Sequence, residues 1–175
     1  MINKKRAIII LAAALVLVMS MTFLVKDYEM AYGKAHRTKE ECMWILLYNR
    51  EDFEYVARIM QKYPSDYIEF DNGTAGTSKI KINDIFLCSS REIAIEILSN
   101  EEFYYHLMNL YKLDVIWAIE YEQHDESFGG NIIMFYFTKF PKDYHGGVYY
   151  GTNIKNDAFT YIIDENWGLL MLPNV

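Results

Sequence analysis

The chain has 175 residues, of which 52% are hydrophobic and 16% aromatic, so it has enough apolar side chains to form a core and lacks the composition of a disordered protein. After residue 25 it carries 14 Lys and Arg against 24 Asp and Glu, a net charge of −10. A domain this acidic is repelled by phosphate backbones, which argues against a nucleic-acid partner. The stretch GTAGTSK lacks the spacing of a phosphate-binding loop, and we expect no cofactor.

Residues 7–25, AIIILAAALVLVMSMTFLV, form an uncharged apolar segment directly behind the basic tail of residues 1–6. As a helix this segment would be about 28 Å long, close to the ~30 Å hydrocarbon core of a bilayer. We therefore expect a single-pass anchor in the lipid bilayer of the cell membrane. The dense basic tail favours a cytoplasmic N-terminus and an extracytoplasmic C-terminal domain. A signal peptide whose cleavage releases a secreted domain is the alternative, although the apolar run is longer than such peptides usually have.

The remaining chain is expected to consist of a juxtamembrane segment, residues 26–37, and one domain, residues 38–175. No Pro-rich or Gly-rich linker and no internal repeat divides it. Its two cysteines, Cys42 and Cys88, lack CxxC spacing and lie in apolar stretches. We expect two buried thiols, which behave as small hydrophobic groups, and a disulfide is the alternative.

Capping boxes, in which Glu follows Ser or Thr by three residues, predict where helices begin. They occur at Thr38 with Glu41, at Ser89 with Glu92 and at Ser99 with Glu102. Asn49 is expected to cap a further helix that ends before Pro64. Between the helix that ends before Pro64 and the helix that begins at Ser89, YIEF and KIKI flank a loop with Asn72-Gly73, which is typical of a β-hairpin.

From Asp114 onward the hydrophobic period changes to two, in the segments VIWAIEYEQ, NIIMFYFTK, GGVYYGT, FTYIID and WGLLML. Turns with Gly, Asn or Asp separate them, which predicts an antiparallel meander. In the first segment we expect Trp117, Ile119 and Tyr121 on one face. Helices followed by strands indicate an α+β fold in which helices pack on one face of a mainly antiparallel sheet.

Three segments, NREDFEYVARI, GGVYYG and DENWGLL, resemble segments of small membrane-anchored proteins from low-GC Gram-positive bacteria. The three segments together make up 24 of the 175 residues. The resemblance implies a location in the cell envelope and implies no activity, because that group has no assigned one.

The stretch KFPKDYHGGVYYG places Tyr144, His145, Tyr149 and Tyr150 around two glycines. An enzyme site would need a nucleophile or a metal next to the histidine, and the adjacent sequence provides neither. Tyrosine offers a large amphipathic contact area at low entropic cost, so we interpret these residues as a candidate binding surface.

Glu120, Glu122 and His124 alternate along EYEQHDE, so a strand would present them on one face, where they could hold a divalent metal. The simpler interpretation is the solvent face of an antiparallel sheet. We therefore expect a domain that acts by binding a ligand or another envelope protein. Two alternatives are a metal-assisted hydrolase of the cell envelope and an immunity or exclusion protein whose anchor neutralises a membrane-active toxin.

Overall fold

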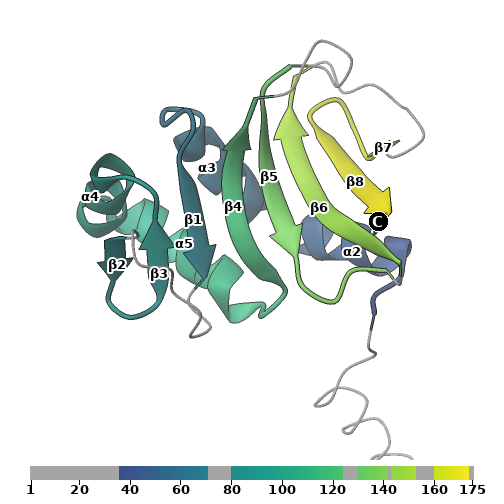
Figure 1. The fold of residues 1–175 in the computed structure, drawn as a ribbon, viewed down its shortest axis with the longest axis horizontal. Coiled ribbons are helices and arrows are strands. Elements are labelled where there is room, and N and C mark those ends of the chain that lie inside the picture. Colours follow the sequence, from purple (N-terminus) through teal and green to yellow (C-terminus); the bar gives the residue numbers. More distant parts are fainter. Residues whose placement is uncertain (1–35, 71–79, 124–129, 142, 153–159, 174–175) are drawn as a thin grey trace, which may run out of the picture. The chain divides into compact units, whose positions relative to one another are not determined.

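The computed structural model describes residues 36–70, 80–123, 130–141, 143–152 and 160–173. From Arg37 onward they belong to one compact unit, an α+β fold with helices behind an eight-stranded antiparallel sheet (Figure 1). The predicted α+β class with a mainly antiparallel sheet is confirmed. The apolar segment 7–25 lies outside the described residues. Within those residues, no helix has both the length and the apolar character to cross a bilayer.

Four helices are described, and their starts follow local hydrogen bonding. The capping box at Thr38 is confirmed: its hydroxyl accepts a bond from the Glu41 N–H (3.2 Å), and the Glu41 carboxylate accepts one from the Thr38 N–H (2.7 Å). Asn49 is an N-cap by position, but its side chain donates to the Ile45 carbonyl. The helices are α2 (Lys39–Tyr48), α3 (Arg50–Met60), α4 (Arg91–Ser99) and α5 (Glu101–Lys112).

The last two helices begin one residue later than the sequence predicts. Ser90 caps α4 and Asn100 caps α5, each by accepting a backbone N–H bond three residues ahead. Ser89 is not available as a cap, because its hydroxyl accepts from the Tyr67 N–H (2.8 Å) and donates to the Asp66 carboxylate (3.2 Å). A tertiary contact thus displaces a cap that the local sequence pattern predicts.

The sheet has the strand order β2-β3-β1-β4-β5-β6-β8-β7, with every neighbouring pair antiparallel. The strands β4, β5 and β6 follow one another as a meander, as predicted. At both edges the order departs from the sequence order. The strands are β1 (Tyr67–Phe70), β2 (Ile80–Ile82), β3 (Phe86–Cys88), β4 (Ile116–Glu122), β5 (Ile132–Phe137), β6 (Tyr144–Gly151), β7 (Thr160–Ile162) and β8 (Trp167–Pro173).

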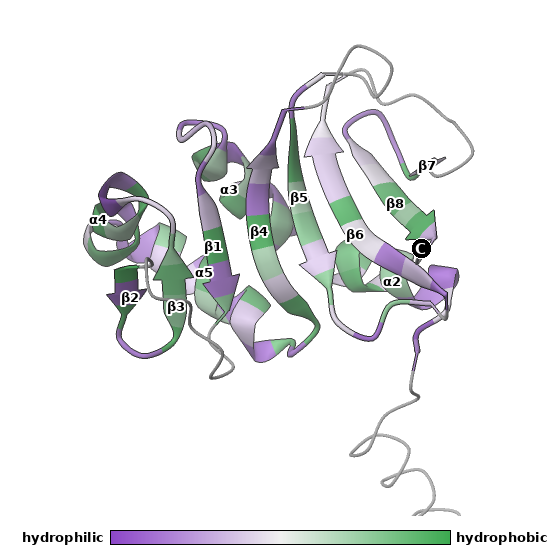
Figure 2. Cartoon of the chain, in the orientation of Figure 1, coloured by the Kyte–Doolittle hydropathy of each residue, from purple (hydrophilic) through white to green (hydrophobic). Residues whose placement is uncertain are grey.

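The predicted hairpin between YIEF and KIKI is wrong, because β3 lies between β1 and β2. All three residues of β3 are buried and β3 is hydrophobic throughout (Figure 2), whereas β2 buries only Ile82. The inner position therefore goes to the strand that is apolar on both faces. The turn from β2 to β3 has positive φ at Asn83 (49°) and Asp84 (58°), as a type I′ turn requires.

The predicted meander is wrong at its last step for the same reason. Strand β8, with five buried residues of seven, pairs with β6, and β7, with one buried residue of three, pairs only with the outer side of β8. The Asp164 carboxylate forms the connecting turn by accepting bonds from the N–H groups of Asn166 (2.9 Å) and Trp167 (3.1 Å). Asp164 also pairs with Arg50 at 2.6 Å, which links this turn to α3.

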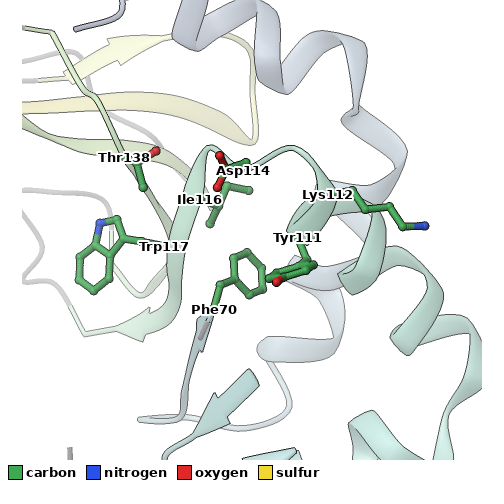
Figure 3. Close-up of a pocket in the computed structure, with 7 residues that line it drawn as sticks. All are labelled: Phe70, Tyr111, Lys112, Asp114, Ile116, Trp117 and Thr138. Carbon is green, nitrogen blue, oxygen red and sulfur yellow. The ribbon is translucent and has the colours of Figure 1, made fainter. Parts of the chain in front are cut away.

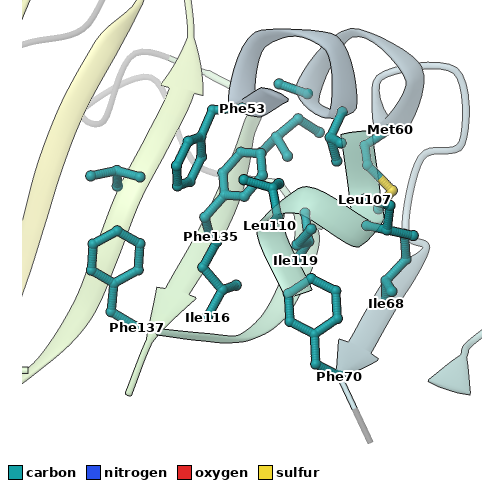
Figure 4. Packing of buried hydrophobic residues seen from close by; sticks show 14 of the residues in the cluster. Phe53, Met60, Ile68, Phe70, Leu107, Leu110, Ile116, Ile119, Phe135 and Phe137 are labelled. Atoms are coloured by element: carbon teal, nitrogen blue, oxygen red, sulfur yellow. The ribbon is translucent and has the colours of Figure 1, made fainter. Parts of the chain in front are cut away.

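The main core lies between the helices and the sheet, and aromatic side chains fill its centre. The ring of Phe53 on α3 lies 4.9 Å from Phe135 and 6.0 Å from Trp167, both in edge-on arrangements. Figure 4 shows Leu107 and Leu110 of α5 among the same buried side chains. Trp167 is fully buried in this core.

Both cysteines are free and fully buried in this core, so the predicted pair of buried thiols is confirmed. Burial raises the pKa of Cys42 and of Cys88 from 9.0 to about 12. The thiolate form, which is the reactive one, is strongly disfavoured at neutral pH.

We predict that neither thiol reacts with Ellman's reagent in the native protein at pH 8 at the rate of an ordinary thiol. A rise from 9.0 to about 12 lowers the thiolate fraction about 1,000-fold, and burial excludes the reagent as well. Both thiols should react rapidly once urea unfolds the chain. The variants Cys42→Ala and Cys88→Ala assign the signal, and rapid native labelling of either thiol would contradict the burial.

Candidate ligand-binding cavity

A cavity of about 450 Å³ lies where β1 and α5 end and β4 begins. Three of its seven lining residues are aromatic: Figure 3 shows the rings of Phe70 and Tyr111 next to each other and the indole of Trp117 apart from them. The two neighbouring rings pack edge to face with centroids 5.9 Å apart. The other lining residues are Ile116, Thr138 and the charged pair Lys112 and Asp114.

The end of α5 shapes one side of the cavity. Asp114 has a φ of 51°, in the left-handed region that aspartate tolerates better than most residues. Its N–H donates to the Tyr111 carbonyl (3.1 Å), which ends the helix and turns the chain into β4. The charged groups of this turn are exposed, and Figure 3 shows the Lys112 ammonium directed away from the aromatic rings.

A β-bulge places Trp117 at the cavity. Ile116 pairs with Phe137 and Ala118 pairs with Tyr136, which leaves Trp117 as one extra residue on β4. The expectation that Trp117 shares a face with Ile119 is therefore wrong. Trp117 is 41% exposed, and its ring centroid lies 5.2 Å from that of Tyr136 on the face of the sheet away from the helices.

This open face of the sheet, opposite the helices, carries a second apolar cluster. The paired strands put side chains of β5, β6 and β8 next to each other on it, and they extend from Tyr136 across the sheet. The open face is therefore not a uniformly polar solvent face. Its buried members are Ile132, Met134, Tyr149 and Leu170.

The structure does not bring the four residues of the tyrosine-rich stretch together on one surface. All four belong to strand β6. Tyr144 and His145 are exposed at its start, whereas Tyr149 is only 3% exposed and belongs to the open-face cluster. Tyr150 points to the opposite face and packs against Trp167 with ring centroids 5.1 Å apart. The described residues that line the cavity include none of these four.

Glu120 and Glu122 lie on the open face of β4, as the two-residue period predicts, next to Met134 and Ile132 of β5. His124 lies outside the described residues. In the part of the chain that the structure covers, no three His, Cys, Asp or Glu side chains are grouped so that they could hold a metal ion. Partial burial, and secondly the negative charge of Glu122, raise the pKa of the Glu120 carboxyl above its usual value.

Comparisons of the chain with protein-family models, with curated proteins and with solved structures find no match. The site is therefore interpreted from its own geometry. The sequence patterns do not predict this cavity, because its residues come from three separate parts of the chain: residue 70, residues 111–117 and residue 138. One signal was present: the five consecutive apolar residues Val115 to Ile119 cannot all face one core in a regular strand, which indicates a bulge or a second apolar face.

We predict that Glu120→Gln raises the free energy of unfolding at pH 7. A carboxyl whose pKa is higher in the folded state binds more protons there than in the unfolded chain, so its contribution to stability falls as the pH rises. The gain should disappear below the unfolded pKa of about 4.5, where both states are protonated. Urea unfolding at pH 7 and at acidic pH measures this difference.

Glu96 provides the matched control. Hydrogen bonds donated by Asn100 (2.9 Å) and by the Tyr63 hydroxyl (2.8 Å) lower the pKa of its carboxyl. Glu96→Gln should therefore lower the free energy of unfolding at pH 7, and this loss should also shrink as the pH falls through the folded pKa. The same sign for both variants at pH 7 would refute the assignment.

Proposed function

We propose that the protein is a binding protein, held at the outer face of the cell membrane by residues 7–25, whose cavity accepts an apolar or aromatic group of its ligand. The observation that supports this most is the 450 Å³ cavity with its aromatic lining and the exposed indole of Trp117. Small-molecule sites commonly have volumes of about 300–1,000 Å³ and a mainly apolar lining with a few polar groups.

The bulge at Trp117 supports a role in recognition. A regular strand would have placed this side chain against the helices, where burial of a large aromatic group contributes about 1.5–3 kcal/mol. Because of the bulge, the indole of Trp117 is not buried and does not contribute this free energy. It forms a rigid aromatic surface beside the cavity. A ligand that covers the indole would recover the unused hydrophobic free energy, as in the aromatic anchors of many interfaces.

The charges around the cavity favour a neutral or positively charged ligand. Glu120 and Glu122 lie on the same face as Trp117, and Asp114 lies in the cavity lining. The ammonium of Lys112 is directed away from the rings (Figure 3). A cation can also lie over the indole face, where the ring quadrupole attracts it.

Fluorine NMR with three fragments tests the cavity: cationic fluorophenethylamine, neutral fluorobenzamide and anionic fluorophenylacetate. We expect the amine to bind most tightly and the acetate least. Trp117→Ala should weaken the binding of the amine about tenfold or more, because it removes the exposed ring. Trp44→Ala is the matched control, since Trp44 is 53% exposed on α2 and is not among the lining residues. Equal binding by wild type and Trp117→Ala would exclude the cavity as the site.

Flotation of cell lysates tests the anchor. The full chain should float with membranes and resist carbonate extraction, because about 20 apolar residues suffice to span the hydrocarbon core. Exchange of residues 7–25 for an unrelated apolar helix should preserve both flotation and the binding of the amine. A full-mass chain that stays in the soluble fraction would contradict the proposed location.

A further inference from the structure

After an acidic first turn, the outward face of α2 is apolar, which is unusual for a helix at the surface of a domain. Cys42 and Leu46 point inward and are fully buried. Trp44, Leu47 and Tyr48 are spaced by three and four residues, so they share the opposite face, where they are 53%, 40% and 80% exposed. The rings of Trp44 and Tyr48 stack with centroids 5.3 Å apart, and Leu47 lies next to Tyr48 on the same side of the helix.

We infer that this α2 patch, formed by Trp44, Leu47 and Tyr48, rests on the lipid bilayer at the depth of the headgroups. The inference depends on the proposed anchor. Scattered exposed apolar side chains need no explanation in a soluble domain. Here they are contiguous, and two of the three are Trp and Tyr, the residues that are enriched at membrane–water interfaces because their rings are amphipathic.

The length of chain between the anchor and α2 supports contact of the α2 patch with the lipid bilayer. Only residues 26–38 separate Val25 from the start of α2, and 13 residues reach at most about 45 Å when fully extended. The chain enters the domain at a fixed point, because the Arg37 N–H donates to the Lys139 carbonyl (2.8 Å) directly before the helix. An anchored chain thus keeps the α2 patch near the bilayer at a high effective concentration, so a weak interaction suffices.

The charges define which lipid surface fits. Glu40 and Glu41 lie in the first turn of α2, and the whole domain is acidic. Lys39 lies over the ring of Tyr161 on β7 at 3.8 Å, so its charge is directed to a neighbouring strand. Contact with the bilayer is therefore driven by the aromatic and aliphatic groups, and anionic headgroups oppose it.

This contact would orient the domain. The helices cover one face of the sheet (Figure 1). The buried residues Cys42 and Leu46 of α2 belong to the core between the helices and the sheet. With the α2 patch on the bilayer, the open face and Trp117 are directed away from the membrane. The proposed binding surface would then be accessible to a ligand or partner from outside.

Quenching of tryptophan fluorescence by brominated lipid tests the inference on the full chain in phosphatidylcholine vesicles. The described tryptophans are Trp44, the similarly exposed Trp117 and the fully buried Trp167. We expect bromine on the upper acyl chain to remove the same absolute fluorescence intensity from the wild type and from Trp117→Phe, and this loss to be absent in Trp44→Phe. Added phosphatidylglycerol should reduce the quenching.

The outcomes separate this inference from the proposed anchor. A chain that fails to float with the vesicles refutes the anchor. A chain that floats but shows the same quenching in wild type and Trp44→Phe, or no quenching in either, refutes only the contact through the α2 patch. A third outcome is that neither bromolipid nor aqueous acrylamide quenches Trp44 and that copies of the chain cross-link through α2. This outcome would show that the α2 patch binds a second copy, and it would also overturn the inference.

Discussion

Contact of α3 with the sheet through Phe53 is the interaction on which the arrangement of the fold depends. Its ring packs on Phe135 of the central strand β5 and on Trp167 of β8, so one side chain joins the helical layer to two strands. Loss of a buried phenylalanine typically costs about 3–5 kcal/mol, against a total stability of about 5–15 kcal/mol. The salt bridge between Arg50 and Asp164 acts at the end of the same helix, but both side chains are partly exposed, so packing dominates.

The sequence predicted those parts of the fold that local hydrogen bonding or periodicity determines. Thr38 with Glu41 forms the predicted capping box, and the two-residue period of NIIMFYFTK gives a strand with Phe135 inward and Met134 outward. Local patterns were insufficient where a distant group competes. Ser89 has the sequence context of a cap, yet it bonds to the chain at Tyr67, which is 22 residues away. Only the tertiary structure reveals that competition.

Strand order was the largest error, and its cause is burial and not turn chemistry. A hairpin between neighbouring segments is the simplest expectation, but β3 and β8 are too apolar for an edge and take the inner positions. The cavity was missed for a related reason. A bulge adds one residue to one strand only, so it depends on the register with the partner, and no single stretch of sequence contains that information. The tyrosines of β6 illustrate the same point, since adjacent residues in a strand face opposite sides.

The two swapped edges leave three-residue strands, β2 and β7, outermost in the sheet. Unpaired backbone groups at a sheet edge can template pairing with another molecule, and the risk grows with the length and flatness of the edge. Edge strands of three residues expose few unpaired backbone groups. Strand β2 also carries Lys81, whose charge disfavours pairing with another strand. Copies of this chain that are confined to the plane of a membrane would meet frequently. The short edge strands would then prevent the sheets of two copies from pairing edge to edge, and so prevent fibril formation.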